Sequence, residues 1–191
     1  MERLIIEELL QWKTSPRRKP LILNGARQVG KTWILKHFGQ MHYDNVAYIN
    51  CDKESLTAKL FEDYDTKRII QAIEAMTNTQ IVAGKTLIII DEIQEVPRGL
   101  HALKYFAENA PEHHIAVAGS LLGLLLHQGE SFPVGKVNML QMHPMTFLEF
   151  LKAMGEDKIY QQLLNREWSV MNTVHEKIVK HLRMYLYVGG M

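Results

Sequence analysis

The segment Leu21-Ile-Leu-Asn-Gly-Ala-Arg-Gln-Val-Gly-Lys-Thr32 decides the fold of this 191-residue chain. Its three leading apolar residues predict a short buried strand over residues 21–24. The chain then runs Gly25-x-x-x-x-Gly30-Lys31-Thr32, which is the spacing of a P-loop. Residues 31–38 have helical spacing, so a strand precedes the loop and a helix follows it. The alternative is a glycine turn without a ligand, but it leaves the Lys-Thr pair at the helix start unexplained.

Each residue type in this loop suits the binding of phosphate. The two glycines let the backbone turn tightly and lie close to a phosphate, where a Cβ atom would collide. Successive backbone N–H groups then point inward, at the positive end of the following helix. The Lys31 ammonium would reach the β- and γ-phosphates, and the Thr32 hydroxyl would ligate Mg²⁺. The predicted nucleotide-binding residues are Gly25, Ala26, Arg27, Gln28, Val29, Gly30, Lys31, Thr32 and Trp33.

A second informative segment is Thr86-Leu-Ile-Ile-Ile-Asp-Glu92. Four consecutive aliphatic residues before two acids predict a strand that is covered on both faces, which is typical of parallel sheets. Ligands bind at the carboxyl ends of such strands. Acids commonly end strands, but after a P-loop this pattern indicates a Walker B motif. Asp91 would then hold Mg²⁺, and Glu92 would orient or activate the attacking water.

Residues 115–120 form a further predicted strand that ends in a small polar residue, Ser120. In P-loop ATPases of the additional-strand type, the strand beside Walker B ends in a polar residue that contacts the γ-phosphate or the water. Ser120 holds that position. It is also a good helix cap by itself, and we favour the sensor interpretation because two stronger motifs precede it.

The remaining elements follow from apolar spacing and turn residues. Gly39 is expected to end the helix after the P-loop. A capping box, Thr146-Phe-Leu-Glu149, predicts a helix start. Further helices are expected at residues 4–13, 53–62, 66–76, 97–110, 146–154, 157–165 and 172–188, and strands at 45–50 and 136–142. We expect residues 1–154 to form a P-loop ATPase domain that includes the N-terminal helix, and residues 155–191 to begin a second, truncated region.

Composition narrows the class of protein. The net charge of +1 implies no global basic field for nucleic acid. The single cysteine, Cys51, excludes an intrachain disulfide framework and fits a reducing compartment. Neither a signal peptide nor a membrane span is evident, so we expect a soluble cytoplasmic protein.

A basic run at residues 15–20 is interpreted as a solvated loop rather than a DNA contact, and the pair His113-His114 is expected at the surface.

Six motifs occur in order along the chain, at residues 25–32, 90–97, 118–123, 132–137, 144–151 and 187–191. In these motifs the chain resembles prokaryotic AAA+-type ATP-binding proteins in which an ATPase domain precedes a C-terminal domain of unknown function. The resemblance implies ATP as the nucleotide and a doubly wound α/β sheet of strand order 5-1-4-3-2. Many relatives have Gly-Arg where this chain has Gly135-Lys136, so Lys136 offers a point charge without a guanidinium fork.

The expected function is Mg²⁺-dependent hydrolysis of ATP, with Lys31, Glu92 and Ser120 as catalytic residues and Thr32 and Asp91 as metal ligands. The hydrolysis would drive or switch a partner, either DNA or a protein, through a missing C-terminal domain, and self-association is also expected. Two other hypotheses stay open: a nucleotide-dependent switch with little hydrolysis, and a small-molecule kinase. No arginine finger is identifiable in cis, so slow turnover by this chain alone is predicted. Arg27 lies in the loop itself and Arg98 follows Walker B, and either or neither would serve a neighbouring subunit.

Overall fold

The computed structural model describes residues 3–52, 57–96, 98–119 and 135–190, and its sheet has five parallel strands in the order β2-β3-β4-β1-β5. Read from β5, this order is 5-1-4-3-2, so the predicted doubly wound sheet is confirmed. The strands are β1 (Leu21–Asn24), β2 (Asn45–Asn50), β3 (Thr86–Asp91), β4 (His114–Ala118) and β5 (Asn138–Gln141).

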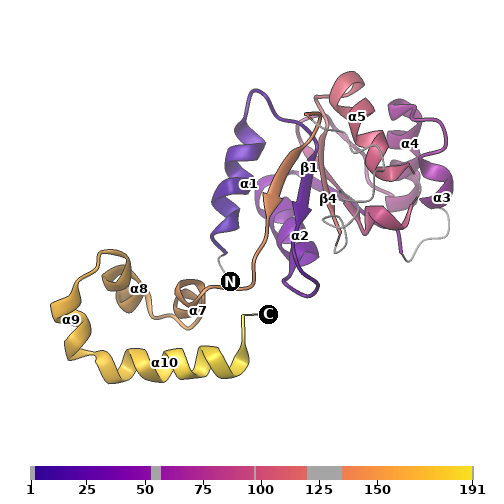
Figure 1. The fold of residues 1–191 in the computed structure, drawn as a ribbon. Helices are drawn as coiled ribbons and strands as arrows, with labels where there is room; N and C mark the ends of the chain where they lie inside the picture. The colour runs from indigo at the N-terminus through magenta and orange to yellow at the C-terminus, as the bar shows by residue number, and fades with distance from the viewer. Residues whose placement is uncertain (1–2, 53–56, 97, 120–134, 191) are drawn as a thin grey trace.

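Helices cover both faces of the sheet (Figure 1). Side chains alternate along β3, which is buried throughout. Leu87 and Ile89 join the core beneath helices α1 and α2, whereas Ile88 and Ile90 join the core beneath α4 and α5. The helices of this part are α1 (Ile5–Thr14), α2 (Lys31–His42), α3 (Thr57–Leu60), α4 (Thr66–Thr77) and α5 (Gly99–Asn109), with a 3₁₀ turn η1 (Ile93–Glu95).

Because all strands are parallel, their carboxyl ends share one edge of the sheet. The register aligns Asn50 with Asp91 and Asp91 with Ala118. Leu23 of β1 also aligns with Ala118. The loop after β1 therefore leaves the sheet on the same side as Asp91, at the end of β3, and Glu92, which follows it, and this brings the two sequence motifs together.

Four more helices follow β5 and extend away from the sheet (Figure 1). They are α7 (Phe147–Ala153), α8 (Asp157–Leu164), α9 (Trp168–Thr173) and α10 (His175–Val188). The predicted capping box is present, since the Thr146 side chain and Glu149 bond reciprocally to each other's backbone N–H groups. Leu151, Ile159 and Tyr160 form a small core between α7 and α8, and Ile178 of α10 packs against it. None of the helices in the described ranges has the length and apolar character needed to span a bilayer.

Several sequence expectations need correction. Gly39 does not end α2, which continues to His42. A Cβ atom at Gly39 would lie 2.6 Å from Val46 Cγ2, so the glycine lets the helix approach β2 closely. His114 is buried within β4 rather than at the surface, and its Nδ1 atom lies 2.7 Å from the Tyr43 hydroxyl.

The limits of other helices and strands also differ from those predicted. The helix predicted over residues 172–188 corresponds to α10, which begins only at His175, whereas residues 172–173 end the separate helix α9, which was not predicted. The strand expected over residues 136–142 covers only Asn138–Gln141. Of the helix expected at residues 53–62, only Thr57–Leu60 is helical within the described residues.

Candidate nucleotide-binding site

The loop between β1 and α2 has a backbone that requires glycine. Gly25 has φ of +155° and Gly30 has φ of +92°, both in the region that side chains disfavour. At Gly25 a Cβ atom would also collide with the carbonyl oxygen of Met142. At Gly30 the nearest atom to a Cβ atom would be Met142 Cε, at an ordinary contact distance of 3.7 Å. Conformation alone therefore requires glycine at position 30, and both conformation and space require it at position 25.

The Lys31 ammonium lies inside this loop. Its Nζ donates to the carbonyl oxygens of Gly25 (2.8 Å) and Ala26 (2.7 Å), and the residue is only 7% exposed. Burial lowers the pKa of Lys31, while the nearby charges of Glu92 and Asp91 partly oppose that change. Within the described ranges no carboxylate forms an ion pair with this ammonium. A buried cation held only by carbonyl oxygens suits an incoming anion such as a phosphate.

The Thr32 hydroxyl joins the loop to β3. Its Oγ1 donates to Asp91 Oδ2 over 2.7 Å, and Asp91 is 4% exposed. The same carboxylate oxygen accepts a hydrogen bond from the Tyr48 hydroxyl at 3.1 Å. Asn50 Nδ2 donates to that hydroxyl at 3.3 Å, and Lys36 Nζ lies 3.2 Å from the centroid of the Tyr48 ring. A hydroxyl and a carboxylate are oxygen ligands of the kind that Mg²⁺ prefers, so these residues fit the metal.

Glu92 follows Asp91 in a left-handed conformation, with φ of 50°. Its backbone N–H donates to Asp91 Oδ1 at 3.2 Å. Its carboxylate accepts a hydrogen bond from Nε2 of Gln94, in the 3₁₀ turn η1 that follows. Gln94 thus holds the side chain of the predicted base beside the loop.

Among these residues, Gly30, Lys31, Thr32 and Glu92 line one cavity of about 680 Å³, a size typical of small-molecule sites. The indole of Trp33 stacks on the His37 ring at 4.8 Å and is 47% exposed, so it offers an aromatic surface at the cavity. The cavity is lined by Arg27, Gln28, Gly30, Lys31, Thr32, Trp33, Asp52, Glu92 and Glu95.

The other residues predicted for nucleotide binding or catalysis are not among the described residues that line the cavity. Gly25 and Ala26 supply the carbonyls that hold Lys31, whereas the Val29 side chain is 2% exposed and packs in the core. Ser120 lies outside the described residues. Tyr48 was not predicted from the sequence, because only the pairing of β2 with β3 reveals that alternate residues of β2 approach Asp91.

The remaining basic candidates do not gather at the cavity, apart from Arg27. Arg98 Nη1 donates to the Glu62 carbonyl at 2.8 Å. Lys136 lies before β5, at the opposite edge of the sheet from the loop, and forms an ion pair with Glu108 at 2.9 Å. The basic run at residues 15–20 precedes β1 at that same distant edge.

Comparison with known proteins places this geometry in a family. The family model described as "AAA domain" matches residues 17–151. Among solved structures, the Walker-type ATPase PABY2304 of Pyrococcus abyssi is similar, with TM-score 0.51, 18% identity, and coverage of 80% of this chain and 57% of that chain. Comparison with curated protein sequences found no match.

Two further structures have lower scores. The Thermotoga maritima RuvB structure has TM-score 0.47 and 16% identity, over 78% of this chain and 45% of that chain. The Aeropyrum pernix ORC1 protein in complex with DNA has TM-score 0.45 and 14% identity, over 80% of this chain and 47% of that chain. The chain thus spans about half the length of these structures. The family match covers well over half of the chain, on a parallel sheet with a P-loop, and the chain therefore belongs to the AAA domain family of P-loop ATPases.

Proposed function

We propose that this chain binds ATP and Mg²⁺ in the cavity beside the P-loop and hydrolyses the γ-phosphate. One observation carries the proposal: the Thr32 hydroxyl lies 2.7 Å from Asp91 Oδ2, and Glu92, the next residue, lines the same cavity. A phosphate-binding loop, a metal-binding pair and a general base are the groups that such a reaction requires.

Each side chain would have a defined role. The loop N–H groups and the Lys31 ammonium would bind phosphate oxygens, which would replace the Gly25 and Ala26 carbonyls as partners of the ammonium. Thr32 and Asp91 would hold Mg²⁺, which when bound neutralises charge on the phosphate oxygens. Glu92 would orient a water molecule and accept its proton.

The roles of two other parts of the chain are also proposed. Ser120 would contact the γ-phosphate or the water. Helices α7 and α8 share a small core against which Ile178 of α10 packs, and α9 contacts α8 and α10. We therefore propose that α7–α10 begin the second region, which would then start ahead of the boundary expected at residue 154. Hydrolysis would act through this region on a DNA or protein partner.

A nucleotide-dependent switch is the second candidate. It is favoured by the contact between Gln94 and the Glu92 carboxylate, and by the presence of only one arginine, Arg27, in the described lining of the cavity. A switch of this kind would bind ATP and hydrolyse it rarely. In a slow ATPase, an arginine supplied by a neighbouring subunit would raise turnover by roughly 10³–10⁵-fold. A rise of this size on self-association would distinguish a slow ATPase from such a switch.

Phosphate release separates the two candidates. We would measure it for the wild type, for Glu92→Gln and for Glu112→Gln, with ATP binding measured separately by calorimetry. Glu112 is an exposed glutamate at the distant edge of the sheet, so its amide variant is the matched control. The hydrolysis proposal predicts that Glu92→Gln lowers the rate by at least roughly 10²-fold and still binds ATP.

The switch would be supported instead if ATP binds tightly to all three proteins and none releases phosphate above the uncatalysed rate. Absence of ATP binding to the wild type would contradict both candidates.

A further inference from the structure

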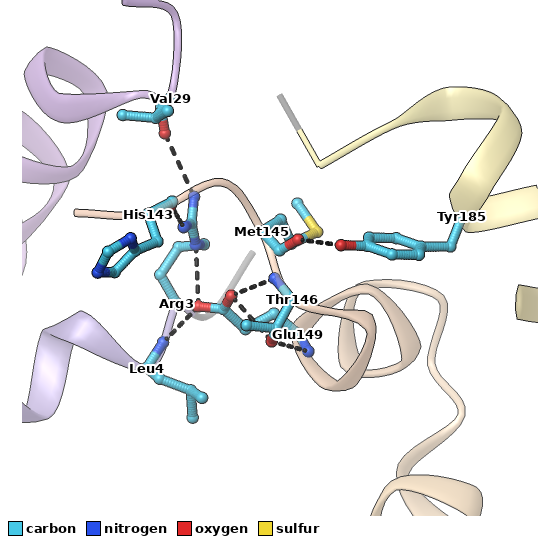
Figure 2. Close-up of polar contacts among 8 residues, drawn as sticks. All are labelled: Arg3, Leu4, Val29, His143, Met145, Thr146, Glu149 and Tyr185. Carbon is cyan, nitrogen blue, oxygen red and sulfur yellow. Dashed lines mark hydrogen bonds and ion pairs between the residues drawn. The ribbon is translucent and has the colours of Figure 1, made fainter. Parts of the chain in front are cut away.

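Arg3 donates a hydrogen bond to a backbone carbonyl of the P-loop, and it belongs to no sequence motif. Its guanidinium is 7% exposed and uses all three nitrogens (Figure 2). Nη1 donates to the Val29 carbonyl at 3.3 Å, Nη2 to the His143 carbonyl at 2.7 Å, and Nε to Glu149 Oε1 at 2.9 Å. One side chain thus joins the loop, the segment after β5 and helix α7.

The contact with Val29 bears directly on phosphate binding. In a trans peptide the carbonyl oxygen and the following N–H point in opposite directions, and the described peptides contain no cis bond. The Val29 carbonyl points toward Arg3, which is not among the described residues that line the cavity, so the N–H of Gly30 points away from Arg3. Gly30 lines the cavity and is the N-cap residue of helix α2, at the helix end where N–H groups bind anions.

Arg3 is itself firmly held. Glu149 is 4% exposed, and its Oε1 also accepts the backbone N–H of Leu4 at 2.9 Å. Its Oε2 accepts the backbone N–H of Thr146 at 2.8 Å and the Thr146 hydroxyl at 3.1 Å. The guanidinium is therefore fixed by a carboxylate whose other lone pairs are occupied. Such a fixed donor can hold a peptide plane that would otherwise be free to rotate in a glycine-containing loop.

We propose that Arg3 is a positioning residue for nucleotide binding, which orients the Val29–Gly30 peptide so that the Gly30 N–H faces the phosphate. The proposal rests on the proposed function, because it assumes that phosphate binds in this loop. Through Glu149 the same guanidinium joins the loop to α7, and so to the helices that lead away from the ATPase sheet (Figure 2).

The test measures the affinity for Mg²⁺–ADP together with the amide signal of Gly30. Valine labelled at the carbonyl carbon and glycine labelled with ¹⁵N select only three Val–Gly peptides in this sequence, at positions 29–30, 134–135 and 188–189. The one that responds to ADP in the wild type, and is lost in Gly30→Ala, is the loop peptide. We expect Arg3→Met to shift this signal in the free protein and to lower ADP affinity roughly tenfold.

Arg3→Lys separates positioning from simple stabilisation. A single ammonium keeps the charge beside Glu149 but lacks the fork that reaches the Val29 carbonyl as well. Thermal stability should therefore recover toward that of the wild type, while ADP affinity stays low. If Arg3→Met does not fold because Glu149 is left unpaired, the double variant Arg3→Met/Glu149→Gln removes both charges and should show the same fall in affinity.

Arg17→Met is the matched control, because Arg17 is exposed and far from the loop. It should leave both the affinity and the Gly30 signal unchanged. The inference is overturned if the wild type binds ADP and the folded Arg3 variants bind it equally well, or if affinity recovers together with stability in Arg3→Lys. Failure of the wild type to bind ADP would overturn the proposed function, and this inference with it.

Discussion

The hydroxyl of Thr32 donates a 2.7 Å hydrogen bond to Oδ2 of Asp91 across 59 residues of sequence. This contact connects the helix that follows the P-loop to the central strand β3. It exists because β1 and β3 both end at the same edge of a parallel sheet, separated by β4. The contact brings the two residues proposed as Mg²⁺ ligands within hydrogen-bonding distance of each other.

Removing the charge of Asp91 should weaken the contribution of Mg²⁺ to nucleotide binding. Asp91→Asn keeps an oxygen that can accept from Thr32 and Tyr48, but it loses the anion that attracts the metal. We expect ADP affinity in EDTA to change little, while the gain in affinity on adding Mg²⁺ falls at least tenfold, about the loss that follows when metal-site partners are removed. Calorimetry with and without Mg²⁺ measures both.

Tyr48→Phe provides a graded comparison for the same site. It removes only the hydroxyl that donates to Asp91 Oδ2 at 3.1 Å. The Mg²⁺-dependent gain should fall by less than in Asp91→Asn, by roughly three- to tenfold. An equal Mg²⁺ dependence in the wild type and in Asp91→Asn would show that the metal is held elsewhere.

Gly39→Ala should destabilise the fold although it lies in a helix. Alanine normally gains about 1 kcal/mol over glycine there. The new Cβ atom would lie 2.6 Å from Val46 Cγ2 and 3.3 Å from Leu87 Cδ2, and overpacking of this kind costs about 1–3 kcal/mol. We expect a net loss of about 1 kcal/mol in the free energy of unfolding, measured by urea titration.

Gln40→Ala is the matched control in the same helix, because Gln40 is exposed. It should change the free energy of unfolding by less than about 0.5 kcal/mol. A Gly39→Ala protein more stable than the wild type would mean that α2 does not pack closely against β2.

Stability should rise with pH between about 4 and 6.5 because of His114. Burial, assisted by the positive charges of Arg18, Lys13 and His113, lowers the pKa of His114 to about 4 from its ordinary 6.5. In this window the unfolded chain binds more protons than the folded chain, so acid favours unfolding. The histidine's contribution is fully present above pH 6.5 and falls by about 3 kcal/mol as the pH decreases to about 4.

The variant His114→Gln should remove this part of the pH dependence, as measured by denaturant titration at several pH values. His113→Gln, the adjacent histidine, should retain it. Parallel pH profiles for the wild type and His114→Gln would contradict the assignment.

Turnover by this chain alone should be slow. Arg27 is the only arginine in the described lining of the cavity, and Arg98 donates to the Glu62 carbonyl. Without an arginine that stabilises the transition state, the rate should lie at least 10³-fold below a typical enzyme turnover of about 10 s⁻¹. A rate near 10 s⁻¹ that is independent of protein concentration would contradict this prediction.

The sheet was predictable from sequence because its signals are local. The aliphatic run of β3 and the glycine spacing after β1 depend only on neighbouring residues, and the order of strands followed from the family resemblance. The end of α2 was not predictable, because Gly39 serves a contact with Val46 that sequence spacing does not reveal. The burial of His114 likewise depends on Tyr43, which lies 71 residues away.

The residues of the candidate site likewise divide into those that local motifs predict and those that depend on contacts between distant segments. Lys31, Thr32, Asp91 and Glu92 belong to motifs of known spacing, and the fold brings them together. Tyr48 and Arg3 carry no motif, since each acts through a contact between segments distant in sequence. Lys136, considered as a positive charge for the site, lies at the opposite edge of the sheet because β5 runs parallel to β1.

A single-turnover measurement tests the central claim most directly. A stoichiometric amount of γ-labelled ATP is bound to an excess of protein with Mg²⁺, and the label released as phosphate is followed in time. Hydrolysis at this site predicts that the wild type converts the bound ATP to ADP, while Glu92→Gln retains it intact. If the wild type and Glu92→Gln release label at the same rate, whether slow or fast, the assignment of this cavity as a hydrolytic site is contradicted.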